Sequence, residues 1–288
     1  METFTLNDGN QIPKLGIGVN QVRSAAVGPA LARAFEVGYR AVDTANTYLN
    51  EVAVGRAIRD SGLPREEVYV TTKVWSTESG HTRMSAAIDR TIERLGTDYL
   101  DLLLVHQQYG DYNGAWRAME EAVAAGKVRS IGVSNFNRER LTDLVSNATV
   151  LPAVAQIERH PYFQQREQKA FLEQFGTVVA GWFPLGRGDR GLLAEPLFAE
   201  LGEKYGKSPA QVILRWHLQG DTIVIPGSTD PDHIRSNYEL FDFSLTAEEM
   251  DRIAAMDKNK RFHNLPELAE RIIFQSMWRG TDYDKRQR

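Results

Sequence analysis

The sequence contains no cysteine among its 288 residues, which excludes disulfide bonds and thiolate metal sites. It also lacks any apolar run near the roughly 20 residues that a membrane-spanning helix needs. Neither sign of charge dominates, because 34 Lys and Arg residues are interspersed with 38 Asp and Glu residues. We therefore expect no nucleic-acid partner and no membrane partner. A cytoplasmic protein is the simplest interpretation, although the lack of cysteine would also suit an exported one.

Several motifs of known chemistry are also missing. The sequence has no Walker loop, no H-E-x-x-H and no G-x-S-x-G, so we expect neither a metal site nor a serine nucleophile of these kinds. The stretch "GIGVNQV" supplies Gly16 and Gly18 but no third glycine. A doubly wound dinucleotide-binding sheet therefore lacks its main signal.

Eight short apolar runs alternate with amphipathic helical patterns such as "MSAAIDRTIERLG". The runs are apolar throughout, which is typical of parallel strands buried on both faces. Their repetition predicts an α/β fold with one (βα)8 TIM barrel over residues 1–288. A β-hairpin precedes the barrel, because "TFTL" and "QIP" flank the turn sequence "NDGN". The predicted barrel strands cover 14–19, 39–44, 68–74, 100–106, 128–135, 153–158, 178–184 and 222–228.

Polar side chains stand at the ends of three neighbouring strands. Asp43, Lys73 and His106 end the second, third and fourth runs, and Tyr48 follows five residues after Asp43. Each has an ordinary structural explanation when taken alone. Together they bring a carboxylate, an ammonium and an imidazole to the mouth where strand ends meet, and such groups need partners there.

The four side chains suit protonation of a carbonyl oxygen as hydride reaches its carbon. A tyrosine, with a pKa of about 10, donates a proton more readily when a neighbouring cation stabilises its anion. Lys73 would supply that charge, and Asp43 would keep Lys73 charged and oriented. His106 would form a hydrogen bond with the substrate oxygen. No side chain donates hydride, so a nicotinamide cofactor is implied.

Six segments, in this order and spacing, resemble the aldo-keto reductase family over most of the chain, and "GWFPLG" favours its bacterial branch related to 2,5-diketo-D-gluconate reductase. The resemblance implies a barrel closed at the bottom by the hairpin, and we expect a monomer. It makes Tyr48 the general acid, Lys73 and Asp43 its tuning pair, His106 the substrate orienter and Trp75 an aromatic wall of the substrate pocket. The segments are "GYRAVDTANTYLNEVAVG", "TTKVW", "LDLLLVHQQ", "IGVSNF", "AQIERHPY" and "VIPGSTDPDHIRSN".

The resemblance also implies where a cofactor binds. Ser134, Asn135 and Gln156 would hold the nicotinamide carboxamide, and the Trp182 ring would stack on the nicotinamide. Leu185 and Gly186 would begin the loop that follows the pyrophosphate. Ser228, with His233 and Asn237 from the helix that begins near residue 231, would receive the adenosine-side phosphate.

Two departures from the family pattern affect cofactor and substrate. Gly227 and His233 occupy positions where many relatives carry cations for the 2′-phosphate, although nearby Arg235 offers a substitute. We therefore expect NADPH or NADH as cofactor, with NADH use favoured by these positions. The stretch "VHQQYG" has glutamines where relatives usually have tryptophan and proline, which predicts a more polar pocket wall.

The tail from about residue 259 leaves two alternatives open. It either places Phe274 or Trp278 over the pocket as a substrate loop, or its charged end is disordered. Its sequence alone does not decide between them.

The function that the sequence favours is NAD(P)H-dependent reduction of small aldehydes or ketones, with keto sugars and dicarbonyls as candidates. One alternative is a cofactor-binding, redox-sensing subunit with low turnover. Another is a sugar isomerase or aldolase, which would need metal-binding carboxylates or Lys73 as a Schiff base. The complete set of Asp43, Tyr48, Lys73 and His106 favours the reductase.

Overall fold

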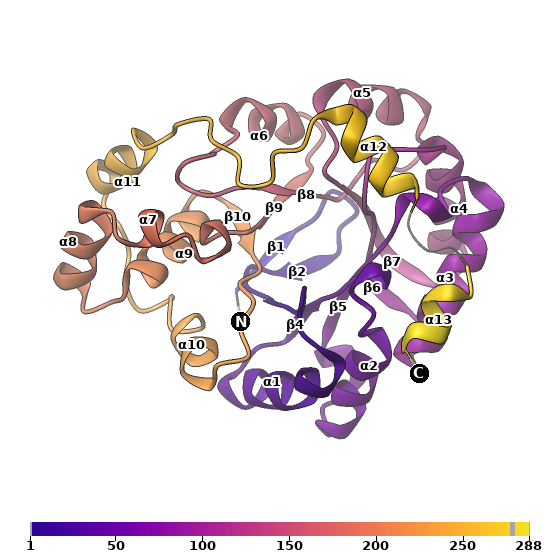
Figure 1. Ribbon diagram of the computed structural model, residues 1–288, viewed down its shortest axis with the longest axis horizontal. Helices are drawn as coiled ribbons and strands as arrows, with labels where there is room; N and C mark the ends of the chain where they lie inside the picture. Colours follow the sequence, from indigo (N-terminus) through magenta and orange to yellow (C-terminus); the bar gives the residue numbers. More distant parts are fainter. Residues whose placement is uncertain (1, 277–279, 288) are drawn as a thin grey trace.

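The computed structural model describes residues 2–276 and 280–287, and its centre is an eight-stranded parallel sheet (Figure 1). Each strand pairs with the next one along the chain. The strands are β3 (Ile17–Gly18), β4 (Ala41–Asp43), β5 (Tyr69–Val74), β6 (Leu100–Val105), β7 (Val128–Ser134), β8 (Val154–Glu158), β9 (Val178–Trp182) and β10 (Thr222–Val224).

The first and last strands of this sheet meet and close it into a barrel. Leu15 forms a parallel bridge with Val224. The Gly16 amide donates to the Val224 carbonyl at 3.0 Å, and the Val224 amide donates to the Lys14 carbonyl at 3.0 Å. The prediction of a (βα)8 barrel is therefore confirmed.

Helices surround the barrel and bury one face each, as their amphipathic patterns predict. In α3, for example, Met84, Ala87, Ile88 and Thr91 are buried at helical spacing. The surrounding helices are α1 (Ser24–Val37), α2 (Glu51–Asp60), α3 (His81–Leu95), α4 (Tyr112–Ala124), α5 (Arg138–Asn147), α6 (Arg166–Glu173), α7 (Arg190–Leu193), α8 (Pro196–Tyr205), α9 (Pro209–Gln219), α10 (Pro231–Ser236) and α11 (Ala247–Ala254).

The predicted hairpin consists of β1 (Thr3–Thr5) and β2 (Gln11–Pro13), which pair antiparallel. Gly9 takes a φ of 86° in its turn, a conformation that glycine adopts without steric cost. The buried Leu6 and Ile12 belong to a hydrophobic cluster with residues from β6, β8, β9 and β10. The Asn10 side chain donates to the Arg129 carbonyl at 3.2 Å, near the start of β7. The hairpin thus covers the end of the barrel where strands begin, opposite the mouth where they finish.

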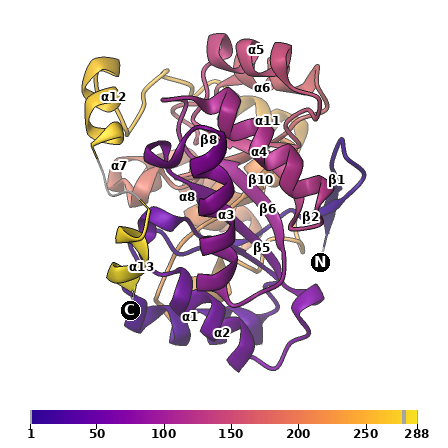
Figure 2. The ribbon, with the colours of Figure 1, turned by 90° about the vertical axis from the view of Figure 1, so that its right-hand side faces the viewer.

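After α11 the chain crosses the mouth and forms α12 (Glu267–Gln275) and α13 (Asp282–Gln287), which lie outside the helical ring (Figures 1 and 2). The buried Arg94 holds α13 against α2 and α3, because it contacts Glu51 at 2.7 Å and Asp284 at 2.6 Å. The charged end of the tail is therefore helical and anchored. Among the described helices, none has the length and apolar character to cross a membrane.

Candidate active site

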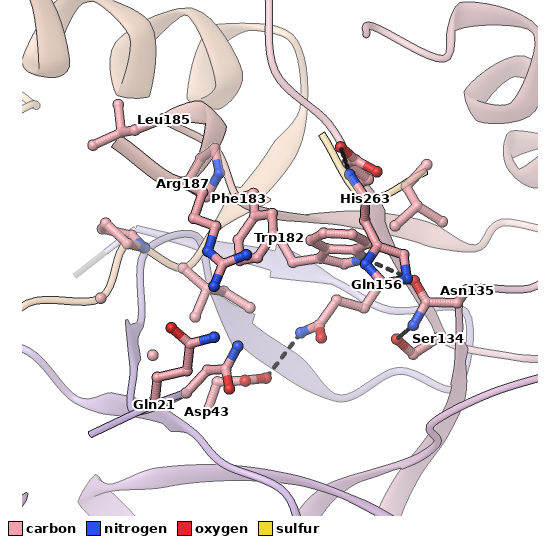
Figure 3. Close-up of a pocket in the computed structure, with 18 of the residues that line it drawn as sticks. Gln21, Asp43, Ser134, Asn135, Gln156, Trp182, Phe183, Leu185, Arg187 and His263 are labelled. Carbon is pink, nitrogen blue, oxygen red and sulfur yellow. Dashed lines mark hydrogen bonds between the residues drawn. The ribbon is translucent and has the colours of Figure 1, made fainter. Parts of the chain in front are cut away.

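A cavity of about 1010 Å³ opens where the barrel strands end (Figure 3). Twelve of the fourteen predicted site residues line it, and Lys73 and Gly186 do not. Lys73 is fully buried. Gly186 has a φ of +58°, and a Cβ there would lie 2.5 Å from the Phe262 ring. Glycine is therefore needed at 186 to turn the loop and pack it against Phe262.

Lys73 connects three of the four strand-end residues. Its Nζ donates to the Asp43 carboxylate, to the Thr44 carbonyl at 2.9 Å and to the Tyr48 hydroxyl at 3.3 Å. The second Asp43 oxygen accepts from Gln156 Nε2 at 2.8 Å. Asp43 on β4 pairs with Thr71 on β5, so Lys73 lies two residues further along β5 on the same face of the sheet. The 3-10 turn η1 (Asn46–Tyr48) brings the phenol to the same group. Every charge in this buried group has a partner, as burial requires.

Burial and the Lys73 charge act on the pKa of Tyr48 in opposite directions. Burial raises this pKa, whereas Lys73 lowers it by stabilising the anion, as expected. Desolvation of the phenolate costs more than the cation returns, so the net direction is upward. Burial also disfavours the Lys73 ammonium, but Asp43 and Tyr48 outweigh it and the pKa of Lys73 is raised. At neutral pH the site holds a protonated phenol beside a charged lysine.

His106 lies beside this group. Its ring is 5.9 Å from the Tyr48 ring and 4.7 Å from the Trp75 ring, between centroids. Burial, assisted by the Lys73 charge, holds the pKa of His106 well below its usual range. Its Nδ1 is buried without a hydrogen-bond partner among the described residues, which leaves Nε2 as the nitrogen that can reach a ligand. The ring is therefore a neutral imidazole that can bind a substrate oxygen.

Trp182 and Asn135 form a second ordered group on the cavity wall (Figure 3). The Trp182 indole donates to Asn135 Oδ1 at 2.8 Å. Asn135 Nδ2 contacts Ser134 Oγ at 3.0 Å and the His106 carbonyl at 3.1 Å. Asn135 adopts a left-handed φ of 62°, which costs free energy and is common at functional sites. The half-buried indole ring is therefore fixed before any ligand binds.

The far end of the cavity, which lies next to α10, is lined by Ser228, His233 and Asn237. Arg235 does not line the cavity. The Asp230 carboxylate accepts from the Asp232 amide at 2.9 Å and the His233 amide at 3.1 Å, at the start of α10. The expectation that this helix start receives a phosphate meets an obstacle, because a carboxylate of the chain already occupies its amides.

Two further cavity residues were not anticipated from the sequence. Gln21 and Arg187 both take left-handed φ values, of 61° and 60°. Figure 3 shows the Arg187 side chain extending across the cavity toward Gln21. Arg187 is exposed and forms no ion pair among the described residues. A cation between two glycines, in "LGRG", is the signal that would have marked it.

The C-terminal tail, which includes α12, forms one further wall of the cavity. The Phe274 carbonyl accepts from Trp75 Nε1 at 2.7 Å and Ser76 Oγ at 3.0 Å, and the Phe274 and Trp75 rings lie 4.9 Å apart. Glu270 and His263 also line the cavity. Of the two aromatic residues considered for this wall, Phe274 is in place. Trp278 lies outside the described residues.

Comparison with known proteins is consistent with this architecture. Residues 13–258 match the family model described as the aldo/keto reductase family. An aldo-keto reductase of Mycolicibacterium smegmatis is 44% identical, with 90% of this chain and 94% of that protein covered. A methylglyoxal reductase of Escherichia coli is 39% identical, with 89% and 94% covered. The crystal structure of a Bombyx mori aldo-keto reductase in complex with NADP superposes with a TM-score of 0.87 and is 35% identical, with 92% and 95% covered.

The match covers the barrel from the end of the hairpin to the end of α11, including all eight strands. Sequence identities of 44%, 39% and 35% indicate a shared family and not merely a shared fold. This chain belongs to the aldo/keto reductase family and is an oxidoreductase that reduces carbonyl groups with a nicotinamide cofactor.

Proposed function

We propose that this reductase acts on small aldehydes and ketones, keto sugars and dicarbonyls among them, with Tyr48 as the general acid. The observation that carries the proposal is the continuous contact from Asp43 through Lys73 to the Tyr48 hydroxyl, next to a neutral His106. A bound nicotinamide cofactor supplies the hydride.

Each residue has a defined part in delivering the proton. The Tyr48 hydroxyl donates its proton to the carbonyl oxygen as the carbon receives hydride, which yields the alcohol. The Lys73 ammonium, 3.3 Å away, stabilises the phenolate that remains until solvent returns a proton. Asp43 keeps that ammonium in place. His106 Nε2 forms a hydrogen bond with the carbonyl oxygen and holds it toward Tyr48.

The cavity fits a dinucleotide and a small substrate together. Its volume of about 1010 Å³ slightly exceeds the roughly 300–1,000 Å³ that is common for small-molecule sites. We assign the nicotinamide end to Ser134, Asn135, Gln156 and Trp182, whose indole plane is already fixed. We assign the diphosphate to the loop that begins at Leu185 and Gly186, with Arg187 as its cation.

We further propose that NADH is used at a rate comparable with NADPH. A 2′-phosphate needs cations, and of the residues assigned to it, Ser228, His233 and Asn237, none is a lysine or arginine. The arginines that line the cavity, Arg187 and Arg261, belong to other segments of the chain. The Asp230 carboxylate lies nearby and opposes a further negative charge. A Cβ on Gly227 would lie 2.9 Å from the Gly18 carbonyl oxygen, so a basic side chain is not accommodated there without a backbone shift.

Lys73 disfavours the alternative of an aldolase that forms a Schiff base at this residue. A lysine that forms a Schiff base must lose its proton, whereas the partners of Lys73 raise its pKa. Its contacts with Asp43 and Tyr48 also leave it beneath the cavity rather than in it.

A panel of carbonyl compounds assayed with NADPH and with NADH tests the proposal. Oxidation of either cofactor that depends on carbonyl and on Tyr48 is the expected result. Binding of cofactor without turnover of any carbonyl would instead support a redox-sensing subunit and contradict the proposed enzyme.

A further inference from the structure

Gln107 stands beside the proposed reaction centre. It follows His106 directly after β6, is 9% exposed and lines the same cavity as Tyr48 and Trp75. Consecutive Cα atoms are about 3.8 Å apart, so the Gln107 and His106 side chains arise within one residue step of each other.

The Gln107 carboxamide makes no hydrogen bond among the described residues. Its neighbour Gln108 is used differently, because Gln108 Oε1 accepts from the Asn137 amide at 2.8 Å and so holds the loop. Neither its nitrogen nor its oxygen is among the buried polar atoms that lack a partner in the described part of the chain, so the carboxamide is accessible from the cavity. A ligand can therefore bind it directly in place of water.

Apart from the His106 imidazole, the polar groups beside Gln107 have partners within the protein. The Trp75 indole donates to the Phe274 carbonyl at 2.7 Å, and the Tyr109 hydroxyl donates to Glu270 at 2.8 Å. Trp75, Tyr109 and Phe274 otherwise form one buried apolar cluster. Gln107 therefore presents a free donor and acceptor to the cavity on a mostly apolar wall, the arrangement by which pockets select the orientation and class of their ligands.

We infer that Gln107 is a substrate-binding residue that recognises a second oxygen on the carbon next to the reacting carbonyl. The inference rests on the proposed function, which places the carbonyl oxygen at Tyr48 and His106. A carboxamide both donates and accepts, so it suits a hydroxyl group or a second carbonyl equally. The substrate class is then that of α-hydroxy carbonyls and 1,2-dicarbonyls rather than simple alkyl aldehydes.

Two pairs of substrates isolate this oxygen. Glycolaldehyde and propanal differ by a hydroxyl in place of a methyl group. 2,3-Butanedione and 3-methyl-2-butanone differ by an oxygen in place of a methyl and a hydrogen. For each pair, the ratio of kcat/KM is measured in the wild type and in Gln107→Leu, and the two ratios are compared. Intrinsic reactivity and hydration of each compound cancel in this comparison.

We expect Gln107→Leu to lower the ratio about tenfold, equivalent to about 1.4 kcal/mol, in at least one pair. The efficiency with propanal should be unchanged or higher. Gln108→Leu is the matched control, and its loss of the Asn137 contact should lower both members of a pair by the same factor. Cofactor affinity, measured by tryptophan fluorescence, should remain that of the wild type in Gln107→Leu.

Unchanged ratios in both pairs would overturn the inference while the proposed function stands, because turnover itself would persist. Equal losses for both members of each pair would also overturn it and make Gln107 a structural residue. Absence of turnover with every carbonyl in the wild type would overturn the proposed function and this inference together.

Discussion

The two ends of the cavity differ in whether their charged groups already have partners within the protein. At the reaction end, the buried Asp43 and Lys73 and the half-buried Tyr48 are in contact, and each charge has a partner. At the end to which we assign the cofactor phosphates, the phosphate end, Arg187 and His233 are exposed and neither forms an ion pair among the described residues. The polar groups of the first end are paired with one another in the protein, whereas those of the second end are free to pair with a ligand.

This difference follows from burial. Charges inside the barrel mouth must be paired during folding, since unpaired ones would cost several kcal/mol each. Charges on exposed loops remain hydrated, so leaving them unpaired costs little free energy. The reaction end is therefore expected to respond to substitution in both stability and rate, and the phosphate end in affinity.

The largest expected effect is that of Tyr48→Phe at the reaction end. Loss of a general acid lowers turnover by roughly 10²–10⁴-fold. Single-turnover reduction measured by stopped flow with saturating cofactor checks the value. Cofactor affinity should be unchanged, because the hydroxyl acts on the substrate. A variant that keeps more than half the wild-type rate of the chemical step would remove Tyr48 from this role.

Asp43→Asn tests whether the buried charges form a unit. Lys73 would remain buried without its carboxylate, and breaking such a pair destabilises proteins by about 3–5 kcal/mol. Urea denaturation of the single variants and of the double variant with Lys73→Met measures the coupling. We expect the double variant to be more stable than the sum of the single losses predicts. Additive losses would show that the two residues act independently.

Arg187→Gln should weaken NADH and NADPH binding alike, by about tenfold, because the diphosphate is common to both and a charge-assisted hydrogen bond is worth about 1.5–3 kcal/mol. Tryptophan fluorescence titration at low and high salt measures the loss, which should shrink as salt screens the contact. Arg190→Gln is the control, since Arg190 is exposed in the same region but does not line the cavity. Loss confined to NADPH would instead place Arg187 at the 2′-phosphate.

His233→Arg is expected to have the smallest effect, a shift in cofactor preference toward NADPH of about fivefold to tenfold. The nearby Asp230 carboxylate limits the gain. Ratios of kcat/KM for the two cofactors give the shift, and Arg235→Gln should leave the ratio unchanged because Arg235 lies outside the cavity lining. A wild-type preference for NADPH of about a hundredfold would contradict our account of this loop.

Much of the fold was predictable because it depends on local periodicity. Eight apolar runs between amphipathic segments predicted the barrel, and the position of Asp43, Lys73 and His106 at run ends predicted that they meet. The net pKa direction of Tyr48 was not predictable. It depends on how completely the surrounding chain excludes water from the phenol, which spacing does not encode.

Asp230 caps its own helix through the amides two and three residues further on, a local contact that the expected phosphate site at this helix start left out. The other loop and the tail depend on tertiary contacts. The Arg187 side chain reaches toward Gln21 because both residues turn through left-handed backbone on separate loops. The sequence left Phe274 undecided, and contact with Trp75 settles it. Sequence by itself determined the barrel and which residues stand at its mouth. Tertiary structure decided which polar groups are satisfied there, because partners distant in sequence compete for them.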